Sequence, residues 1–249
     1  MKGTTPSGAR TEQEAAHWVR GMFGRVAHRY DLANHVLSCN IDRRWRARTV
    51  RRLQDILDRP DARVLDICCG TGDLALALAL AMPRARVLGS DFCHPMLVAA
   101  HGKIGKIGHR AVVSLFESDA LRLPLGDASL DLLTVAFGFR NLANYDAGLA
   151  EIRRVLRPGG TVAILEFSQP PNRVFGAIYR FYARRILPLI GGALTGSPDA
   201  YRYLPESVQK FPDAPQLAAD MGRAGFRDVG FEYMTGGIVA LHTGVAQNN

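Results

Sequence analysis

The chain has little that would carry it across a membrane or into an oxidising compartment. Its apolar stretches are interrupted by Arg, Asp or Pro before they reach the length of a membrane span. The N-terminus lacks the apolar segment of a secretory signal. The four cysteines show no metal-ligand spacing. We therefore expect a cytoplasmic protein with reduced thiols and no bound metal.

Lysine is also scarce, since 27 of the 31 basic residues are arginine. The formal net charge of +8 suits RNA, an anionic lipid surface or an anionic substrate. With 249 residues, 47% of them hydrophobic, the chain can bury one sizeable core. We expect a single domain over residues 11–249, preceded by a disordered segment over residues 1–10.

Helix-like and strand-like patterns alternate along most of the chain. Residues 11–60 carry apolar side chains at three- and four-residue spacing, which predicts an N-terminal helical cap. The expected strands are 63–67, 85–90, 111–116, 129–135 and 160–167, and the expected helices are 73–81, 94–103, 144–156 and 214–224. This alternation predicts an α/β fold with a mostly parallel, doubly wound sheet. Residues 227–233 and 237–243 predict a C-terminal antiparallel hairpin at the sheet edge.

The insert from residue 172 to 203 differs in character from the rest of the chain. Pairs of apolar and aromatic side chains alternate with arginines, and we expect Pro188 and the glycines after it to break the helix. A basic, aromatic-rich amphipathic helix is typical of an element that lies on a membrane surface. A lid that packs on the core with its arginines in water fits the same pattern. The sequence leaves both interpretations open.

The most informative motif is an apolar strand that runs into a glycine turn, V64-L-D-I-C-C-G-T-G-D73. Gly70 and Gly72 allow the backbone to turn sharply and to approach a ligand closely. Asp66 and Asp73 lie where a dinucleotide-binding loop would face a pyrophosphate, which carboxylates repel. These charges argue against a nicotinamide oxidoreductase. They suit a ligand with an ammonium and a sulfonium group, which is S-adenosylmethionine.

Further polar residues follow the next predicted strands, at the edge where a doubly wound sheet binds its ligands. Asp91, next to Phe92, follows the second strand, where a carboxylate can accept both hydroxyl groups of a ribose. Asp119 and Ala120 follow the third strand, where a carboxylate can accept the amino group of adenine. The expected cofactor-binding residues are Asp66, Gly70, Thr71, Gly72, Asp91, Phe92, Asp119, Ala120 and Ala136. This ordered set predicts a Rossmann-like class I S-adenosylmethionine-dependent methyltransferase.

Several separate motifs resemble the C-methyltransferases of ubiquinone and menaquinone biosynthesis, over residues 20–244. They are Tyr30–Asn34, Phe137–Asn141, Arg154–Gly160 leading to Leu165–Ser168, Tyr203–Val208 and Thr235–His242. Ala136 and Asp42 depart from the family, where a serine and a histidine are common. The resemblance, which is to the demethylmenaquinone methyltransferase type, implies methyl transfer to a ring carbon of a polyprenyl quinol. The implied reaction converts demethylmenaquinol to menaquinol.

The resemblance also implies what the catalytic residues must do. A quinol carbon is a poor nucleophile until an adjacent phenol loses its proton, so the site needs a proton acceptor and a cation. We expect Arg140 to stabilise the developing oxyanion, because a guanidinium stays protonated, and Asn141 to orient the ring. Asp73, directly or through a water, is the candidate base. A structural ion pair between Arg140 and a nearby Asp is the alternative.

Other interpretations remain open at this stage. The 2-polyprenyl-6-methoxy-1,4-benzoquinol intermediate of ubiquinone biosynthesis is a second candidate substrate. An RNA methyltransferase would explain the basic charge, but the sequence contains no Asn-Pro-Pro-Tyr-type motif and no appended RNA-binding module. A non-catalytic interaction protein would not need the ordered carboxylates. We expect as partners a lipophilic quinol and, transiently, an anionic surface at the inner face of the cytoplasmic membrane. We expect no nucleic acid, and a homodimer stays open.

Overall fold

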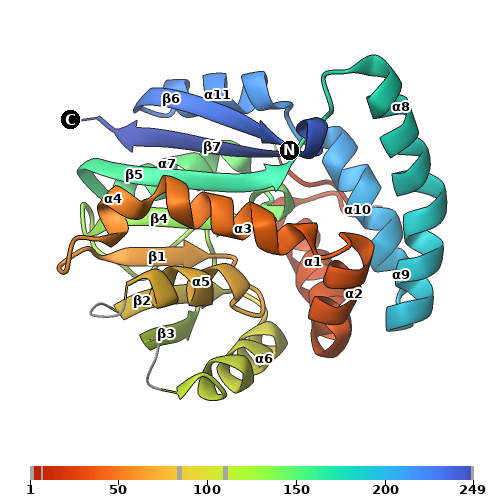
Figure 1. The fold of residues 1–249 in the computed structure, drawn as a ribbon, viewed down its shortest axis with the longest axis horizontal. Helices are drawn as coiled ribbons and strands as arrows, with labels where there is room; N and C mark the ends of the chain where they lie inside the picture. Colours follow the sequence, from red (N-terminus) through yellow and green to blue (C-terminus); the bar gives the residue numbers. More distant parts are fainter. Residues whose placement is uncertain (1–2, 7, 83–85, 109–111, 248–249) are drawn as a thin grey trace.

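The structure, a computed structural model, describes residues 3–6, 8–82, 86–108 and 112–247 (Figure 1). Its centre is a seven-stranded sheet with the order β3-β2-β1-β4-β5-β7-β6. In chain order the strands are β1 (Val64–Ile67), β2 (Arg86–Asp91), β3 (Val112–Glu117), β4 (Leu130–Ala136), β5 (Leu156–Phe167), β6 (Phe226–Met234) and β7 (Val239–Ala246). Strands β1 to β5 pair in parallel, and β7 is antiparallel to both β5 and β6.

This topology confirms the predicted doubly wound sheet with a C-terminal hairpin. The four residues of β1 are all buried, because helices cover both faces of the sheet, as parallel strands require. On one face α7 (Tyr145–Val155) packs on the central strands and α11 (Ala214–Arg223) packs on β6 and β7. The other face is covered by α3 (Ile41–Arg52), α4 (Gln54–Leu57) and α5 (Asp73–Ala81). Helix α6 (His94–Gly105) follows β2.

The N-terminal segment forms the predicted helices, which continue into the sheet-covering α3 and α4. Helix α1 (Glu12–Val26) begins at a capping box, in which Thr11 and Glu14 each bond the other's backbone N–H. Helix α2 (Tyr30–Leu37) follows after a short 3₁₀ turn. Within the segment expected to be disordered, Thr4 is buried: its hydroxyl lies 2.7 Å from the Tyr203 hydroxyl and its N–H donates to the Leu142 carbonyl.

The insert forms two long helical stretches at one end of the sheet (Figure 1). The first comprises α8 (Arg173–Phe181), a π-helical turn over Tyr182–Ile186 and α9 (Leu187–Thr195), and the second is α10 (Pro198–Lys210). The predicted break at Pro188 is wrong. Pro188 lies in the first turn of α9, where a missing N–H costs little, and helical structure continues to the left-handed Gly196.

The start of strand β5 also differs from the prediction. The expected strand begins at residue 160, whereas β5 begins at Leu156, which pairs with Leu130. Thr161 pairs with Leu132, so residues 157–160 form a bulge within the strand. Residues 85 and 111, predicted to begin the second and third strands, lie outside the described residues. Among the described residues, none of the helices combines the length and the apolar character that a membrane span requires.

Candidate active site

A cavity of about 410 Å³ opens at the carboxyl ends of the parallel strands, a volume typical of small-molecule sites. Its walls come from the ends of β1, β2 and β4, from the helical cap and from α8 to α10. Of the twelve residues expected in the site, the cavity is lined by Asp66, Gly70, Thr71, Asp73, Asp91, Phe92, Asp119, Ala120, Ala136, Arg140 and Asn141. Gly72 does not line it. A Cβ at Gly72 would lie 3.3 Å from the Cβ of Ala100, so this glycine serves packing against α6.

The loop after β1 has a backbone that only a few residues adopt easily. Gly70 and Gly72 have φ angles of +56° and +82°, and Cys68 has a φ of +50°. The neighbouring loop after β4 makes room for it, because a Cβ at Gly138 would lie only 2.4 Å from the Cβ of Cys68. The two loops therefore pack directly against each other at the floor of the cavity.

Two carboxylates at the strand ends, those of Asp66 and Asp91, are buried, and no residue that the structure describes forms an ion pair with either. Asp91 accepts hydrogen bonds from the N–H groups of Gly70 and Cys93 at 2.8 and 2.9 Å, and burial raises its pKa to about 6. Asp66 accepts a hydrogen bond from the Thr134 hydroxyl at 2.7 Å, and burial raises its pKa to about 7. A cationic ligand with hydroxyl groups would restore the charged form of both. These residues thus fit S-adenosylmethionine.

Two predicted cofactor-binding residues, Asp119 and Ala120, lie in the turn after β3. Asp119 accepts a hydrogen bond from the Leu121 N–H at 2.9 Å, which fixes the turn after β3. Ala120 is buried beside it, and both line the cavity. The expected contact between Asp119 and an adenine amino group stays a prediction.

Asp73 lies in a network of charges that the sequence analysis did not foresee. Lys103 Nζ lies 2.5 Å from Asp73 Oδ1, and an Arg46 nitrogen lies 3.1 Å from Asp73 Oδ2. Lys103 also contacts Asp31 at 2.5 Å, and Asp31 accepts a hydrogen bond from the Thr71 hydroxyl at 2.5 Å. The network ties the cap to the glycine loop and to α6. Both oxygens of Asp73 already face a cation, so the role of base stays a prediction without support from this geometry.

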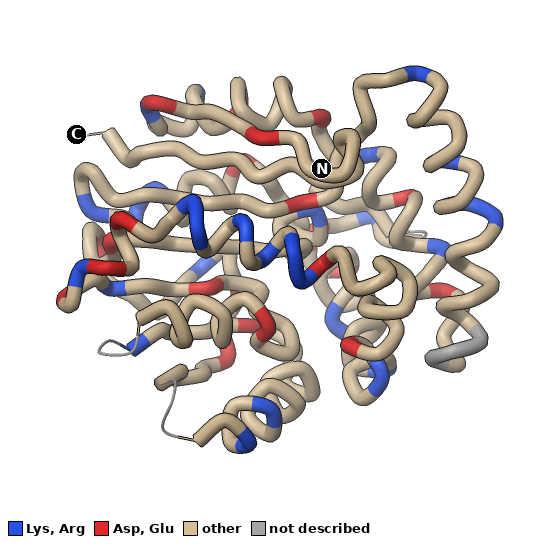
Figure 2. Tube along the Cα trace, viewed as in Figure 1, with Lys and Arg blue, Asp and Glu red and all other residues tan. Residues whose placement is uncertain are grey.

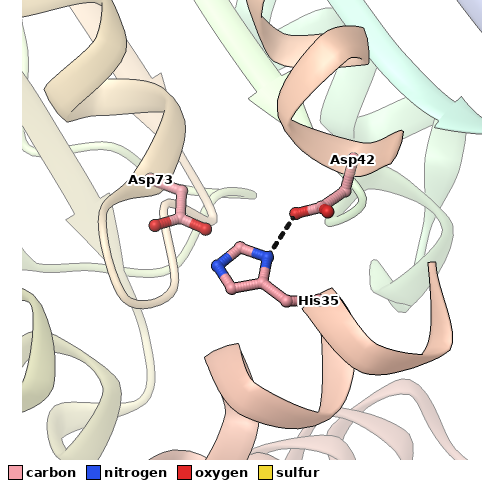
Figure 3. Close-up of side chains that lie close together, drawn as sticks. All are labelled: His35, Asp42 and Asp73. Carbon is pink, nitrogen blue, oxygen red and sulfur yellow. Dashed lines mark hydrogen bonds and ion pairs between the residues drawn. The ribbon is translucent and has the colours of Figure 1, made fainter. Parts of the chain in front are cut away.

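The same network contains the three residues shown in Figure 3. The imidazole of His35 lies between the carboxylates of Asp42 and Asp73, and its Nδ1 is 2.9 Å from Asp42 Oδ2. The three side chains bring their ligand atoms within 4.8 Å of one another, which is close enough for a metal ion. However, Arg46 pairs with both carboxylates, at 2.5 Å from Asp42 and 3.1 Å from Asp73. A divalent cation would have to displace this guanidinium, so the geometry favours a charge network over a metal centre.

Arg140 is buried at the wall of the cavity and is ion-paired. Its NH1 lies 2.9 Å from Glu166 Oε1, and its backbone N–H donates to Glu166 Oε2 at 3.2 Å. Burial alone would lower the pKa of Arg140, but the Glu166 carboxylate raises it, so the guanidinium stays charged. The guanidinium carbon lies 5.3 Å from the centre of the Phe167 ring. The alternative to an oxyanion-stabilising role is a structural ion pair between Arg140 and an aspartate. The structure shows an ion pair, but its acidic partner is Glu166.

Aromatic side chains surround Arg140, and the sequence analysis missed most of them as site residues. Phe137 packs between Trp45 and Phe167, with ring centres 5.8 and 4.8 Å away. Tyr179 also lines the cavity, and burial raises its pKa to about 12, so its hydroxyl stays protonated. In the sequence, Tyr179 is one of several aromatic residues of the insert, and nothing there distinguishes it as a site residue. The cavity therefore combines an apolar, aromatic interior with the buried guanidinium of Arg140.

Asn141 is held by the protein itself. Its Oδ1 accepts a hydrogen bond from the Tyr203 hydroxyl at 3.0 Å, and its Nδ2 donates to the Phe137 carbonyl at 3.3 Å. Both ends of the amide thus have partners, so Asn141 fixes the wall that carries Tyr203. Its expected contact with a substrate ring stays a prediction.

Comparisons with known proteins agree with this site. A demethylmenaquinone methyltransferase of Thermus thermophilus is 48% identical over 223 residues, which are 90% of this chain and 99% of the relative. A ubiquinone/menaquinone biosynthesis C-methyltransferase UbiE of Syntrophotalea carbinolica is 44% identical over 225 residues, 90% of this chain and 92% of the relative. The solved structure of a SAM-dependent methyltransferase from Aquifex aeolicus shares the fold, with a TM-score of 0.57 and 20% identity over 78% of this chain and 87% of that one.

A family model gives the same result over nearly the whole chain. It matches residues 10–246 and is described as the ubiE/COQ5 methyltransferase family. The matched range includes the cap, the sheet and the insert, so every part of the cavity lies within it. The chain therefore belongs to the ubiE/COQ5 methyltransferase family and is a methyltransferase that uses S-adenosylmethionine.

Proposed function

We propose that this protein methylates a ring carbon of a polyprenyl quinol, converting demethylmenaquinol to menaquinol. The observation that carries the proposal is that one cavity joins the carboxylates suited to S-adenosylmethionine to an aromatic compartment that contains the buried Arg140. An aromatic wall fits a flat naphthoquinol ring. The names of the relatives support the same class of substrate.

One set of residues binds the cofactor, and another set, in the aromatic compartment, binds the quinol ring. Asp91 and Asp66 hold the cofactor, which when bound supplies the methyl group on its sulfonium sulfur. Arg140 stabilises the negative charge that develops on the quinol oxygen when the ring becomes nucleophilic. Phe137 and Phe167 exclude water from the ring, which strengthens the interaction of the oxygen with Arg140.

The proposal extends to the place of action. The substrate carries a polyprenyl chain and resides in a lipid bilayer, whereas the described residues contain no helix fit to span one. The protein therefore acts as a peripheral protein at the inner face of the cytoplasmic membrane.

The test is methyl transfer from radiolabelled S-adenosylmethionine to three acceptors, which are demethylmenaquinol, 2-polyprenyl-6-methoxy-1,4-benzoquinol and total RNA. We expect label in menaquinol, at a kcat/KM at least tenfold above that for the benzoquinol. A preference for the benzoquinol would assign the protein to ubiquinone synthesis instead. Label in RNA, or in none of the three acceptors, would overturn the proposal.

A further inference from the structure

Large apolar side chains on the outer side of the α8–α9 stretch are exposed to solvent. Val174, Ile178 and Phe181 are 71%, 63% and 63% exposed, and Leu189 on α9 is 74% exposed. The first three follow one another at spacings of four and three residues, so they share one face of α8. An apolar face of this extent on a water-facing helix marks an interaction surface.

The charge of the same stretch has one sign. Between residues 172 and 198 the sequence contains four arginines and neither Asp nor Glu. Figure 2 shows this helix with basic positions and without acidic ones. Arg173, Arg180 and Arg185 are exposed and make no ion pair with any residue that the structure describes. Arg184 differs, because it donates a hydrogen bond to Gln209 at 2.7 Å and so faces α10.

From these contacts we propose that α8, the π-helical turn and α9 form the face that docks this protein on an anionic lipid bilayer. We call this face, defined by Val174, Ile178, Phe181, Leu189 and the three unpaired arginines, the docking face. Apolar side chains beside exposed arginines are the pattern of a helix that lies in the headgroup region. The proposal rests on the proposed function, since a polyprenyl quinol is the reason for an enzyme to reach a bilayer.

The helices that carry the docking face also line the cavity from within. Tyr179, Tyr182 and Leu187 project from α8, the π-helical turn and α9 into its lining, and Leu37 of α2 faces them. Leu187 packs with Leu37 and Tyr182 in one apolar cluster. A polyprenyl tail that leaves the cavity between these helices would therefore enter the bilayer beneath the docking face without crossing water.

A second copy of this chain is the other occupant that an apolar face could have. In a twofold dimer through the docking face, the same surface of both copies meets itself. The unpaired arginines of one copy would then approach those of the other with no acidic residue on the stretch to balance them. Like charges brought together in this way oppose association, whereas anionic headgroups neutralise them.

The test is sedimentation of the full-length protein with sucrose-loaded vesicles. We expect binding to phosphatidylcholine vesicles that contain 25% phosphatidylglycerol and little binding to pure phosphatidylcholine, with release as salt is raised. The triple variant Arg173→Gln, Arg180→Gln, Arg185→Gln should bind at least tenfold more weakly. The matched control Arg44→Gln, Arg51→Gln, Arg52→Gln removes the same charge from exposed positions on α3 and should bind as the wild type does.

A second variant tests the apolar part of the docking face. Ile178→Ser with Leu189→Ser should weaken binding while leaving the salt dependence in place, because the arginines remain. Circular dichroism and S-adenosylmethionine affinity establish that each variant is folded. Methylation of a short-chain, water-soluble quinol should be unchanged in all of them, which separates the docking face from the proposed function.

Two results would overturn the proposal. One is vesicle binding by the arginine variant that equals that of the α3 control. The other is a dimer in light scattering that both docking-face variants dissociate, which would assign the face to a second copy. If the wild type methylates no quinol of either chain length, the proposed function fails instead.

Discussion

Arg140, in the 3₁₀ turn that follows β4, and Glu166, near the end of β5, form a buried ion pair, with 2.9 Å between NH1 and Oε1. Their side chains are 5% and 1% exposed, so each charge depends on the other for compensation. The pair holds the guanidinium against the Phe167 ring and keeps it at the cavity wall in one orientation. A cation fixed in this way needs no reorganisation when negative charge develops on a substrate oxygen.

The first prediction concerns this guanidinium. Arg140→Lys keeps the charge and a partner for Glu166 but loses the planar fork. We expect kcat on demethylmenaquinol to fall at least a hundredfold, with S-adenosylmethionine affinity within twofold of the wild type. Steady-state kinetics and calorimetry measure the two quantities. A parallel loss of cofactor affinity would place Arg140 in the cofactor site or the scaffold.

A second prediction concerns the ribose contact proposed for Asp91. Hydrogen bonds to a charged group contribute about 1.5–3 kcal/mol each, so Asp91→Ala should weaken S-adenosylmethionine binding at least tenfold in calorimetry. Asp91 also accepts from the N–H groups of Gly70 and Cys93, so near-ultraviolet circular dichroism serves as the folding control. Unchanged affinity in a folded variant would remove Asp91 from the site.

The raised pKa values of Asp91 and Asp66 predict a pH dependence. Burial raises them to about 6 and about 7, so both residues are protonated in the free protein at pH 5 and ionised at pH 8. A cationic ligand binds the ionised form, so affinity should rise as pH increases from 5 to 7 and level off above pH 8. Binding near pH 6 should release protons, which calorimetry in buffers of different ionisation enthalpy detects. In Asp91→Asn the rise should shift toward pH 7, where Asp66 alone titrates.

Asp73 is the subject of a prediction that separates two roles. In the structure it joins the cap to the glycine loop through Arg46 and Lys103, so Asp73→Asn should raise the KM for S-adenosylmethionine. Lys103→Gln should produce a similar rise, because it removes the same contact from the other side. A hundredfold loss of kcat in Asp73→Asn, with KM unchanged and Lys103→Gln near the wild type, would instead support the role of base.

The packing of the two loops at the floor of the cavity gives a prediction about stability. Gly138→Ala places a Cβ 2.4 Å from that of Cys68 and should lower the free energy of unfolding by about 1–3 kcal/mol, as overpacking does. Cys68→Gly removes the clashing atom and relieves the positive φ of +50°. The double variant should therefore regain part of the loss in urea unfolding. Purely additive effects would show that the two loops are not coupled.

Local patterns predicted most of the sheet and most of the cavity lining. The ends of β1 and β2 could be found because a short apolar run followed by glycine or aspartate is visible within a few residues. The partners of Asp73 could not be found in this way. Arg46 and Lys103 are far from it in sequence, and only the docking of the cap and of α6 brings them together.

The environments of Pro188 and Thr4 also depend on neighbouring structure that a local sequence pattern does not show. Pro188 was expected to break a helix, but the π-helical turn ahead of it makes it a first-turn residue, where its missing N–H has no partner to lose. Thr4 was expected to be disordered because its surroundings are polar and rich in glycine. It is buried because Tyr203, almost two hundred residues later, offers its hydroxyl a partner.

Strand β7 follows the other six strands of the sheet in the sequence, yet it lies inside the sheet between β5 and β6. Before β7 is in place, the edge of β5 that faces it, from Thr161 to Phe167, has unpaired N–H and C=O groups. Strand β6 then has no neighbour in the sheet. The sheet can therefore close only after β7 has left the ribosome. A nascent or truncated chain without β7 exposes two open edges, through which copies can pair and aggregate.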